Sequence, residues 1–352
     1  MFYPVKLNNT FFNFFISWLL IIPFVVFKGG YEGPKVVWFL GGVIILTIFW
    51  IWRLLVLKKN IEFLKSDFFF ILWLWLFFVS SLLGIHPLES ILGGSYRHQG
   101  VLFFLALWLV KKTLEILPEE KKTFLKKGIA LSVILEAFIV ISQVLLAKTY
   151  FARPLGTLGE PNAVAGFLAV GSFFVSFWFW PFLAIFLTGS RTGIAAFTVF
   201  LLSRFRRLPL GVILLVVLAA VFIFFKGGEL RPKSKFEDRG LFWQMAATFI
   251  KERPILGWGA ETQEYLYDRE FARREMPLQG MIVDRSHNLF LDVAIWSGMF
   301  GLLAFVGWLV SLGFELKRNT RMLFGLLAWI VFSVFQPLGV VHWLLLFLIL
   351  NW

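Results

Sequence analysis

The stretch VDRSHNLFLDVAIWSGMFG, residues 283–301, begins polar and then stays apolar for most of the thickness of a membrane. A continuous apolar run of this length, as opposed to an alternating one, favours a helix over a strand. The chain has only four histidines, and one of them, His287, lies where the polar part meets the apolar part. The stretch therefore predicts a membrane helix with a titratable histidine at its start.

Apolar runs of this kind recur from one end of the chain to the other. Hydrophobic residues make up 59% of the 352 residues, whereas soluble domains contain about 45–50%, and the mean hydropathy is +0.81. Hydrocarbon offers backbone N–H and C=O groups no hydrogen-bond partner, so a spanning segment must be a helix or part of a closed barrel. Since the runs are continuous, we predict an all-α polytopic integral membrane protein.

The net charge of +13 has a topological explanation. Basic residues cluster in short loops between the apolar runs, which is the positive-inside pattern of membrane proteins, so nucleic acid is not expected as a partner. The absence of cysteine excludes disulfides and thiolate metal sites. The N-terminus, MFYPVKLNNTFFNFF, lacks a small-residue cleavage site, and we interpret the first apolar run as a retained helix.

Five spans are predicted before residue 150. They cover residues 10–27, 34–57, 67–85, 100–117 and 123–146. Between them, RLLVLKKNIEFLK and KKTLEILPEEKKTFLKK are strongly basic and are expected in the cytoplasm. The N-terminus is then inside, and the outer loops lie near residues 29–33, 86–99 and 148–162.

Residues 162–203 begin at an outer loop and end at the basic loop SRFRR (residues 203–207), so they must cross an odd number of times. Three crossings leave each one shorter than the roughly 17–25 residues that a full span needs. Trp180-Pro181 and LTGSRTG (residues 187–193) are natural break points. We therefore predict three short or broken helices, with GSRTG sunk toward the outer face, where irregular backbone must line a polar cavity.

Four further crossings complete the predicted topology. They cover residues 208–225, 287–314, 322–336 and 338–352, which makes about twelve transmembrane helices in all. The chain is thus a single membrane domain with an N-terminal bundle (1–225), one long extracytoplasmic loop (226–286), which is periplasmic if the protein is from a bacterial inner membrane, and C-terminal helices (287–352).

The long loop contains two predicted helices. RGLFWQMAATFIKE (residues 239–252) places Phe242, Met245, Ala246 and Phe249 on one face, as in an amphipathic helix on a membrane surface. ETQEYLYDREFARRE (residues 261–275) is expected to be mostly solvated.

Two arginines are candidates for binding an anion. Arg191, in TGSRTG, is flanked by apolar sequence, and its guanidinium fork matches phosphate oxygens; the alternative is an interfacial arginine that reaches the headgroups. Arg239 opens the amphipathic helix of the long loop, and a pair with Glu237 or Asp238 is at least as good an interpretation from its position alone. Two arginines that converge on one outer cavity favour an anionic ligand such as a diphosphate.

His287 is the candidate general base. Asp284 and Ser286 precede it, and either is a possible N-cap of the helix that follows. The positive end of the helix dipole and Arg285 both favour a neutral ring, which can accept a proton from a hydroxyl. The alternative is a capping or interfacial histidine. Asp292, inside the apolar run, either orients a neighbour or reaches the interface.

Arg97 and Arg153, in the outer loops, are weaker candidates for phosphate or headgroup binding and are better explained as structural. The outer loops contain no Asp-x-Asp pair, and no histidines have metal-ligand spacing. A phosphate-binding glycine loop is also absent, so we expect neither a metal nor a cofactor.

Taken together, the motifs resemble the O-antigen ligase and O-antigen polymerase superfamily, which includes pilin-type bacterial oligosaccharyltransferases. The resemblance covers most of the chain and rests on GSYRHQG (94–100), RPLGTLGEPNAVAGFLA (153–169), LTGSRTG (187–193), RGLFW (239–243) with KERPILGWG (251–259), and SHNLFLDVAIWSGMFG (286–301). The last segment is similar to the family's pattern of His-Asn, nine residues and Gly-x-x-Gly, here His287, Asn288, Gly298 and Gly301.

The resemblance implies an enzyme of the bacterial inner (cytoplasmic) membrane that transfers a glycan from undecaprenyl diphosphate to an acceptor hydroxyl at the periplasmic face. Transfer would be metal-independent and would invert the anomeric centre. Arg191 and Arg239 would hold the donor diphosphate and His287 would activate the acceptor, with Asn288, Ser190, Arg153 and Arg97 as possible supporting residues.

The favoured member is an O-antigen ligase that acts on lipid A core in lipopolysaccharide biosynthesis. Alternatives in the same superfamily are a polysaccharide polymerase and a protein O-oligosaccharyltransferase, with a glycan or protein hydroxyl as acceptor. The chain is short for the family, notably in residues 162–203. A lipid-linked glycan flippase is the alternative from another class, because broken helices around a buried site are also a transporter trait.

Overall fold

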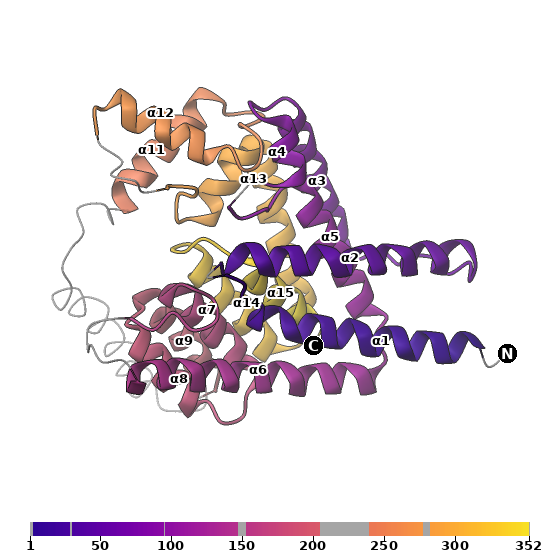
Figure 1. Ribbon diagram of the computed structural model, residues 1–352. Coiled ribbons are helices and arrows are strands. Elements are labelled where there is room, and N and C mark those ends of the chain that lie inside the picture. The colour runs from indigo at the N-terminus through magenta and orange to yellow at the C-terminus, as the bar shows by residue number, and fades with distance from the viewer. Residues whose placement is uncertain are drawn as a thin grey trace.

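The computed structural model describes residues 3–28, 30–94, 96–146, 153–204, 239–276 and 282–351, with the side chains of residues 3–8 left out. Over these ranges the chain is helical, and the only β contact is an isolated bridge between Phe27 and Gly30 (Figure 1). This confirms the predicted all-α class. The predicted span 208–225 lies outside the described residues.

The described residues between 3 and 146 form six α-helices, five of them close to the predicted segments, and α1 packs against α2 and α6. They are α1 Tyr3–Ile21, α2 Glu32–Leu55, α3 Lys65–Leu82, α4 Pro87–Leu92, α5 Val101–Glu115 and α6 Glu119–Leu146. The five predicted spans are therefore confirmed as helices. Helix α4 is an addition, because it lies in a segment that was expected to be an outer loop.

Four helices are long and apolar enough to cross a membrane, namely α2, α3, α6 and α13 (Leu289–Leu316). Shorter apolar helices include α14 (Thr320–Ser333) and α15 (Val340–Leu350), which at about 1.5 Å per residue do not reach across 30 Å of hydrocarbon. A full crossing at α14 or α15 would need residues from the neighbouring segments as well. The number of about twelve crossings stays a prediction.

Residues 162–203 form short helices, as predicted. They are α7 (Pro161–Gly171), which continues as the 3-10 turn Ser172–Phe174, then α8 (Phe179–Thr188) and α9 (Arg191–Arg204). The first break lies just before Phe179 instead of at Trp180-Pro181, because the first turn of a helix does not need the N–H group that proline lacks. The second break is at Gly189, whose φ of 60° ends α8 in the left-handed conformation.

Helix α13 is interrupted at Gly298, where φ is 67° and ψ is −173°. Residues 254–259 fill the break: Trp258 N donates to Ile295 O (2.7 Å), Gly259 N to Trp296 O (3.0 Å), and Met299 N to Pro254 O (2.8 Å). A Cβ atom at position 298 would lie 2.0 Å from Ile255 O. Glycine is required here both for the backbone conformation and for this close approach.

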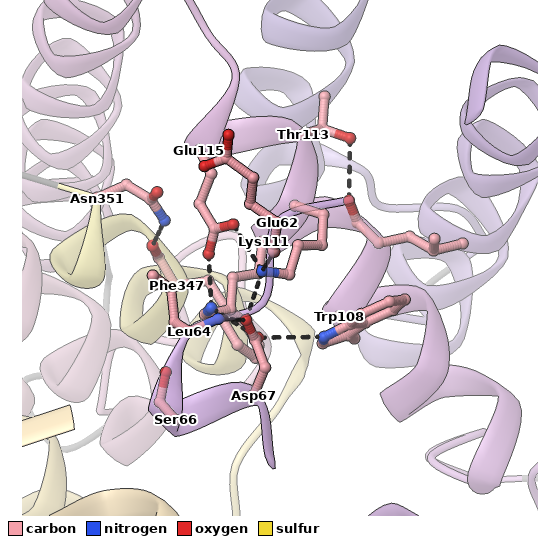
Figure 2. A network of polar contacts seen from close by, with 12 residues as sticks. Glu62, Leu64, Ser66, Asp67, Trp108, Lys111, Thr113, Glu115, Phe347 and Asn351 are labelled. Atoms are coloured by element: carbon pink, nitrogen blue, oxygen red, sulfur yellow. Dashed lines mark hydrogen bonds and ion pairs between the residues drawn. The ribbon is translucent and has the colours of Figure 1, made fainter. Parts of the chain in front are cut away.

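Helices α3 and α13 pack along each other, and a cluster of charges fixes the end of the bundle where α3 begins (Figure 2). The buried carboxylate of Asp67 accepts hydrogen bonds from Lys111 Nζ (2.8 Å), from Lys112 Nζ and from Trp108 Nε1 (3.2 Å). Glu115 also accepts from both lysines. Because every charge has an opposite partner, the cluster can stay buried.

Helices α11 (Arg239–Glu252) and α12 (Gln263–Arg273) lie over the start of α13 at one end of the molecule (Figure 1). Their contact forms a small second core, whose buried members are Phe242, Met245, Ala246, Phe249, Trp258, Leu266, Tyr267, Phe271, Val283 and Ile295. The apolar face of α11 was predicted to lie on the membrane surface, and this is wrong. The face is buried against α12 and α13, and α12 is correspondingly less solvated than expected, because the two amphipathic faces cover each other.

Replacing Gly298 with alanine should lower the thermal stability of the protein. The backbone strain alone is worth about 1–3 kcal/mol, and the clash with Ile255 O adds to it. Gly313→Ala is the matched control in the same helix, since nothing lies within 4 Å of a Cβ atom there, and it should be neutral or stabilising by up to about 1 kcal/mol. Unfolding temperatures of the two purified variants test this. Equal temperatures would contradict the role given to Gly298.

Candidate functional site

The backbone before α13 is held by a buried carboxylate. Asp292 accepts hydrogen bonds from Ser286 N (2.8 Å), Ser286 Oγ (2.6 Å) and Gln263 Nε2 (2.7 Å). Gln263 in turn accepts from Trp296 Nε1 (2.7 Å). Of the two roles considered for Asp292, the structure supports orientation of its neighbours, and the residue it orients immediately precedes His287.

The N-cap of α13 is Asn288, not Asp284 or Ser286. Its side-chain oxygen accepts from Phe290 N (3.0 Å) and Leu291 N (3.2 Å), and its extended backbone is typical of an N-cap. The prediction was wrong because the hydroxyl of Ser286 is already engaged by Asp292 and the carboxylate of Asp284 by Arg97. His287 therefore lies one residue before the N-cap, with a φ of 59°, a conformation that is uncommon for a residue with a side chain.

The ring of His287 lies under α11. It stacks on Phe242, with ring centroids 5.8 Å apart and planes inclined by 15°. Its Nδ1 is buried and has no hydrogen-bond partner among the described residues. Since Phe242 is three residues after Arg239, one turn of α11 brings an aromatic cover and a guanidinium to the same ring.

The imidazole is neutral near pH 7. Burial, and after it the positive charges of Arg239 and Arg97, lower the pKa of His287 to about 4, although Asp284 and Gln336 oppose the fall. A neutral ring was expected from the helix dipole and Arg285. Burial and two arginines from distant segments are further causes of the lowered pKa.

Arg97 is paired. Its guanidinium donates to the carboxylate of Asp284, through Nε and through Nη2 (3.4 Å). Burial opposes ionisation of Asp284, but Arg97 and Arg285 keep the pKa of Asp284 below its usual range. The pair ties the outer loop before α5 to the segment that carries His287. Arg97 thus has the kind of structural role that was expected of it, and it lies close to the candidate base.

Arg191 begins α9, and Ser190 is buried directly before it. Ser190 Oγ accepts from Gly193 N (3.2 Å), as an N-cap does. The next residue, Thr192, faces Gln336 Nε2 at 3.5 Å. The side chain of Gln336 also raises the pKa of His287. Gln336 therefore lies close to both the start of α9 and the segment that carries His287.

Arg153 holds the turn from α8 to α9. Its Nε donates to Thr188 O (2.7 Å), and its Nη2 donates to Asn162 Oδ1 (2.9 Å), at the start of α7. The side chain therefore fixes the backbone that presents Ser190 and Arg191. This supports the structural interpretation of Arg153.

Charged groups of both signs surround the His287 segment. Arg239 and Arg97 act on the ring of His287, and a small pocket beside Asp284, the partner of Arg97, is lined by Glu89, Glu261 and Glu264 together with Asp284, Arg285, Tyr96, Tyr265 and Gly94. Burial and the neighbouring carboxylates raise the pKa of Glu264, which reflects the negative potential there. An anionic ligand is therefore disfavoured in this acidic pocket.

The structure adds residues that the sequence did not single out. Gln336 is the most informative, because it joins the surroundings of His287 to α9; the signal was a lone amide between an apolar run and Pro337. Phe242 was recognised only as part of an apolar face, and Asp284 only as a possible cap. Within the described ranges no group of three or more His, Asp or Glu side chains is placed to hold a metal.

The lowered pKa of His287 makes a prediction about stability. Between pH 6.5 and about 4 the unfolded state binds more protons at this residue than the folded state does, so folding stability rises with pH across that window. The wild-type protein should lose more stability than His287→Gln as the pH falls from 6.5 to 4.5. Unfolding temperatures at both pH values measure the difference. Parallel curves for the two proteins would show that burial does not perturb the ring.

Comparison with known proteins supports the resemblance found in the motifs. Residues 174–306 match the family model described as O-antigen ligase. The matched segment includes Ser190, Arg191, Arg239, His287 and Asn288, while Arg97, Arg153 and Gln336 lie outside it. No curated protein matches the chain. Members of the matched family are glycosyltransferase-like membrane enzymes, and residues 174–306 of this chain are similar to them.

Proposed function

We propose that the protein transfers a glycan from undecaprenyl diphosphate to an acceptor hydroxyl at the periplasmic face of the bacterial inner membrane, as an O-antigen ligase that acts on lipid A core. The family match supports glycosyl transfer. The observation that carries the proposal is the neutral ring of His287, which stacks on Phe242 and lies within electrostatic range of two arginines. A neutral imidazole beside positive charges suits a reaction that removes one proton and releases one anion.

In the proposed step, the acceptor oxygen attacks the anomeric carbon of the donor. A bond forms between that oxygen and the carbon, and the bond between the carbon and the phosphate oxygen breaks with its electron pair going to the diphosphate. His287 takes the proton of the hydroxyl. Attack from the face opposite the leaving group inverts the anomeric centre, and no metal is required if guanidinium groups stabilise the diphosphate.

Arg191 and Arg239 are the proposed diphosphate ligands. Arg191 lies in the first turn of α9, where the backbone N–H groups and the helix dipole also favour an anion. Arg239 begins α11 and acts electrostatically on His287. The carboxylates that line the pocket beside Asp284 would repel a diphosphate, which is a further reason to assign the diphosphate to the two arginines.

The supporting residues act on the backbone around these groups. Asn288 caps α13, Ser190 caps α9, and Arg153 holds the turn before Arg191. Arg97 positions Asp284 and adds positive charge near His287. We assign these four residues positioning roles.

Replacing His287 should separate catalysis from donor binding. We expect His287→Ala to lower transfer by about 10²–10⁴-fold, the usual contribution of a general base, while donor binding changes little. Arg191→Gln or Arg239→Gln should weaken donor binding by about tenfold or more, as expected for the loss of one charge-assisted contact. Arg273→Gln, which changes an exposed arginine of α12, is the control.

The assay uses the full-length protein in nanodiscs with a defined undecaprenyl-diphosphate glycan. Lipid A core, a second lipid-linked repeat unit and a pilin-type protein are offered separately, and the product mass identifies the acceptor. Normal transfer by both His287→Ala and Arg191→Gln would exclude the proposed site. Movement of the lipid-linked glycan across the bilayer, with no product from any acceptor, would indicate a flippase instead.

The pH dependence of transfer should reflect a ring that is hard to protonate. The free enzyme's kcat/KM reports the pKa of its essential base, and the pKa of His287 is about 4. We therefore expect kcat/KM to stay level from pH 7 to pH 5.5 and to fall only at lower pH. An acid limb centred near 6.5 in this profile is the result that would contradict the buried, neutral base.

A further inference from the structure

A second group of arginines lies where α9 ends and α14 begins, away from the candidate site at the start of α9. Helix α9 runs from Arg191, at the site, to Arg204, and its 14 residues span about 20 Å. Helix α14 returns from Thr320 toward Gln336. Between these far ends is a cavity of about 730 Å³, lined by Phe200, Ser203, Arg204, Arg318, Asn319, Thr320, Arg321 and Phe324.

The described lining of the cavity is strongly basic. It contains three guanidinium groups, those of Arg204, Arg318 and Arg321, and no carboxylate. None of the three forms an ion pair among the residues that the structure describes. Arg204 and Arg321 are close enough to repel each other. A ligand that brings negative charge into the cavity would remove this repulsion.

The remaining lining residues suit a ligand that is only partly polar. Thr320 and Arg321 form the first turn of α14, which Asn319 caps by accepting from Met322 N (3.3 Å). The positive end of the α14 dipole therefore faces the same region as the guanidinium groups. Phe200 and Phe324 add an apolar wall. Hydrophilic anions need no such wall, whereas a lipid has a phosphate next to a glycerol and acyl chains.

We propose that this cavity binds the phosphate-bearing headgroup of an anionic membrane lipid. Its volume is far larger than an inorganic phosphate needs and lies in the range of sites for small organic ligands, about 300–1,000 Å³. The three arginines belong to the basic loops at residues 203–207 and 317–321, whose charge predicts the cytoplasmic face. Anionic lipids attract basic groups at that leaflet. Positive-inside topology accounts for basic loops, but not for three arginines around one cavity.

The test uses the full-length protein in nanodiscs of phosphatidylcholine to which phosphatidylglycerol is added, with lipid retention measured by native mass spectrometry. The variant Arg204→Gln, Arg318→Gln, Arg321→Gln should bind phosphatidylglycerol about a hundredfold more weakly, since each basic residue near a membrane surface contributes about fivefold. The control Lys58→Gln, Lys59→Gln, Lys127→Gln removes the same charge from exposed positions of other basic segments and should retain binding. Arg321→Gln alone, which changes one exposed side chain, should show an intermediate loss.

Two further outcomes decide against the proposal. Equal losses in the arginine and lysine variants would mean that general surface charge, not the cavity, attracts the lipid. A second arm adds inorganic phosphate or diphosphate to protein in pure phosphatidylcholine. Arginine-dependent stabilisation by these anions, with no further gain from phosphatidylglycerol, would assign the cavity to a soluble phosphate compound. Retention of phosphatidylglycerol that resists the free anions supports the lipid headgroup.

Discussion

The break in α13 leaves backbone groups that cannot complete a regular helix, and in a membrane protein such groups must find partners inside the chain. Residues 254–259 supply them, through Trp258 N, Gly259 N and Pro254 O. Ser80 of α3 also donates to Trp296 O. A single interruption thus joins the membrane helices α3 and α13 to the connection between α11 and α12. The positions of those two outer helices depend on these hydrogen bonds.

The candidate site is a consequence of that attachment. Once α11 is fixed over α13, Phe242 covers the ring of His287 and Arg239 comes within electrostatic range of it. Asp292 accepts two hydrogen bonds from Ser286, the residue before His287. The position of the ring is therefore set both by α11 and by the backbone that precedes α13. A general base needs this kind of restraint, because proton transfer depends on both the distance to the hydroxyl and the angle of approach.

Charge is distributed so that His287 is neutral while its surroundings are positive. Arg97 is matched by Asp284, and the carboxylates near Glu261 lie beyond that pair. Arg191 and Arg239 begin α9 and α11, while the carboxylates of the pocket come from α4, α12 and the segments next to them. The arginines near His287 disfavour protonation of the imidazole and attract an anion.

Much of this was predictable from local sequence. The long apolar runs predicted the helices, and glycine and proline in residues 162–203 predicted the short ones, with Gly189 ending α8 as expected. Local sequence did not identify the cap of α13. Asn288, Asp284 and Ser286 are all capable N-caps by residue type, and the choice was made by Arg97 and Asp292, which occupy two of them. The sequence identified the apolar residues of α11 correctly but not what they pack against, because an apolar helix face can be covered either by lipid or by protein.

The sequence by itself determined that the chain is a helical membrane protein, which helices are short, and that His287, Arg191 and Arg239 are the residues to examine. These conclusions follow from apolar length, charge and residue type, which need no knowledge of neighbours. Only the tertiary structure decided that Phe242 covers His287, that Gln336 lies between His287 and Thr192, and that Arg97 is paired. Those facts are contacts between segments far apart in the chain. A lone glutamine or arginine does not reveal its partner until packing brings the two together.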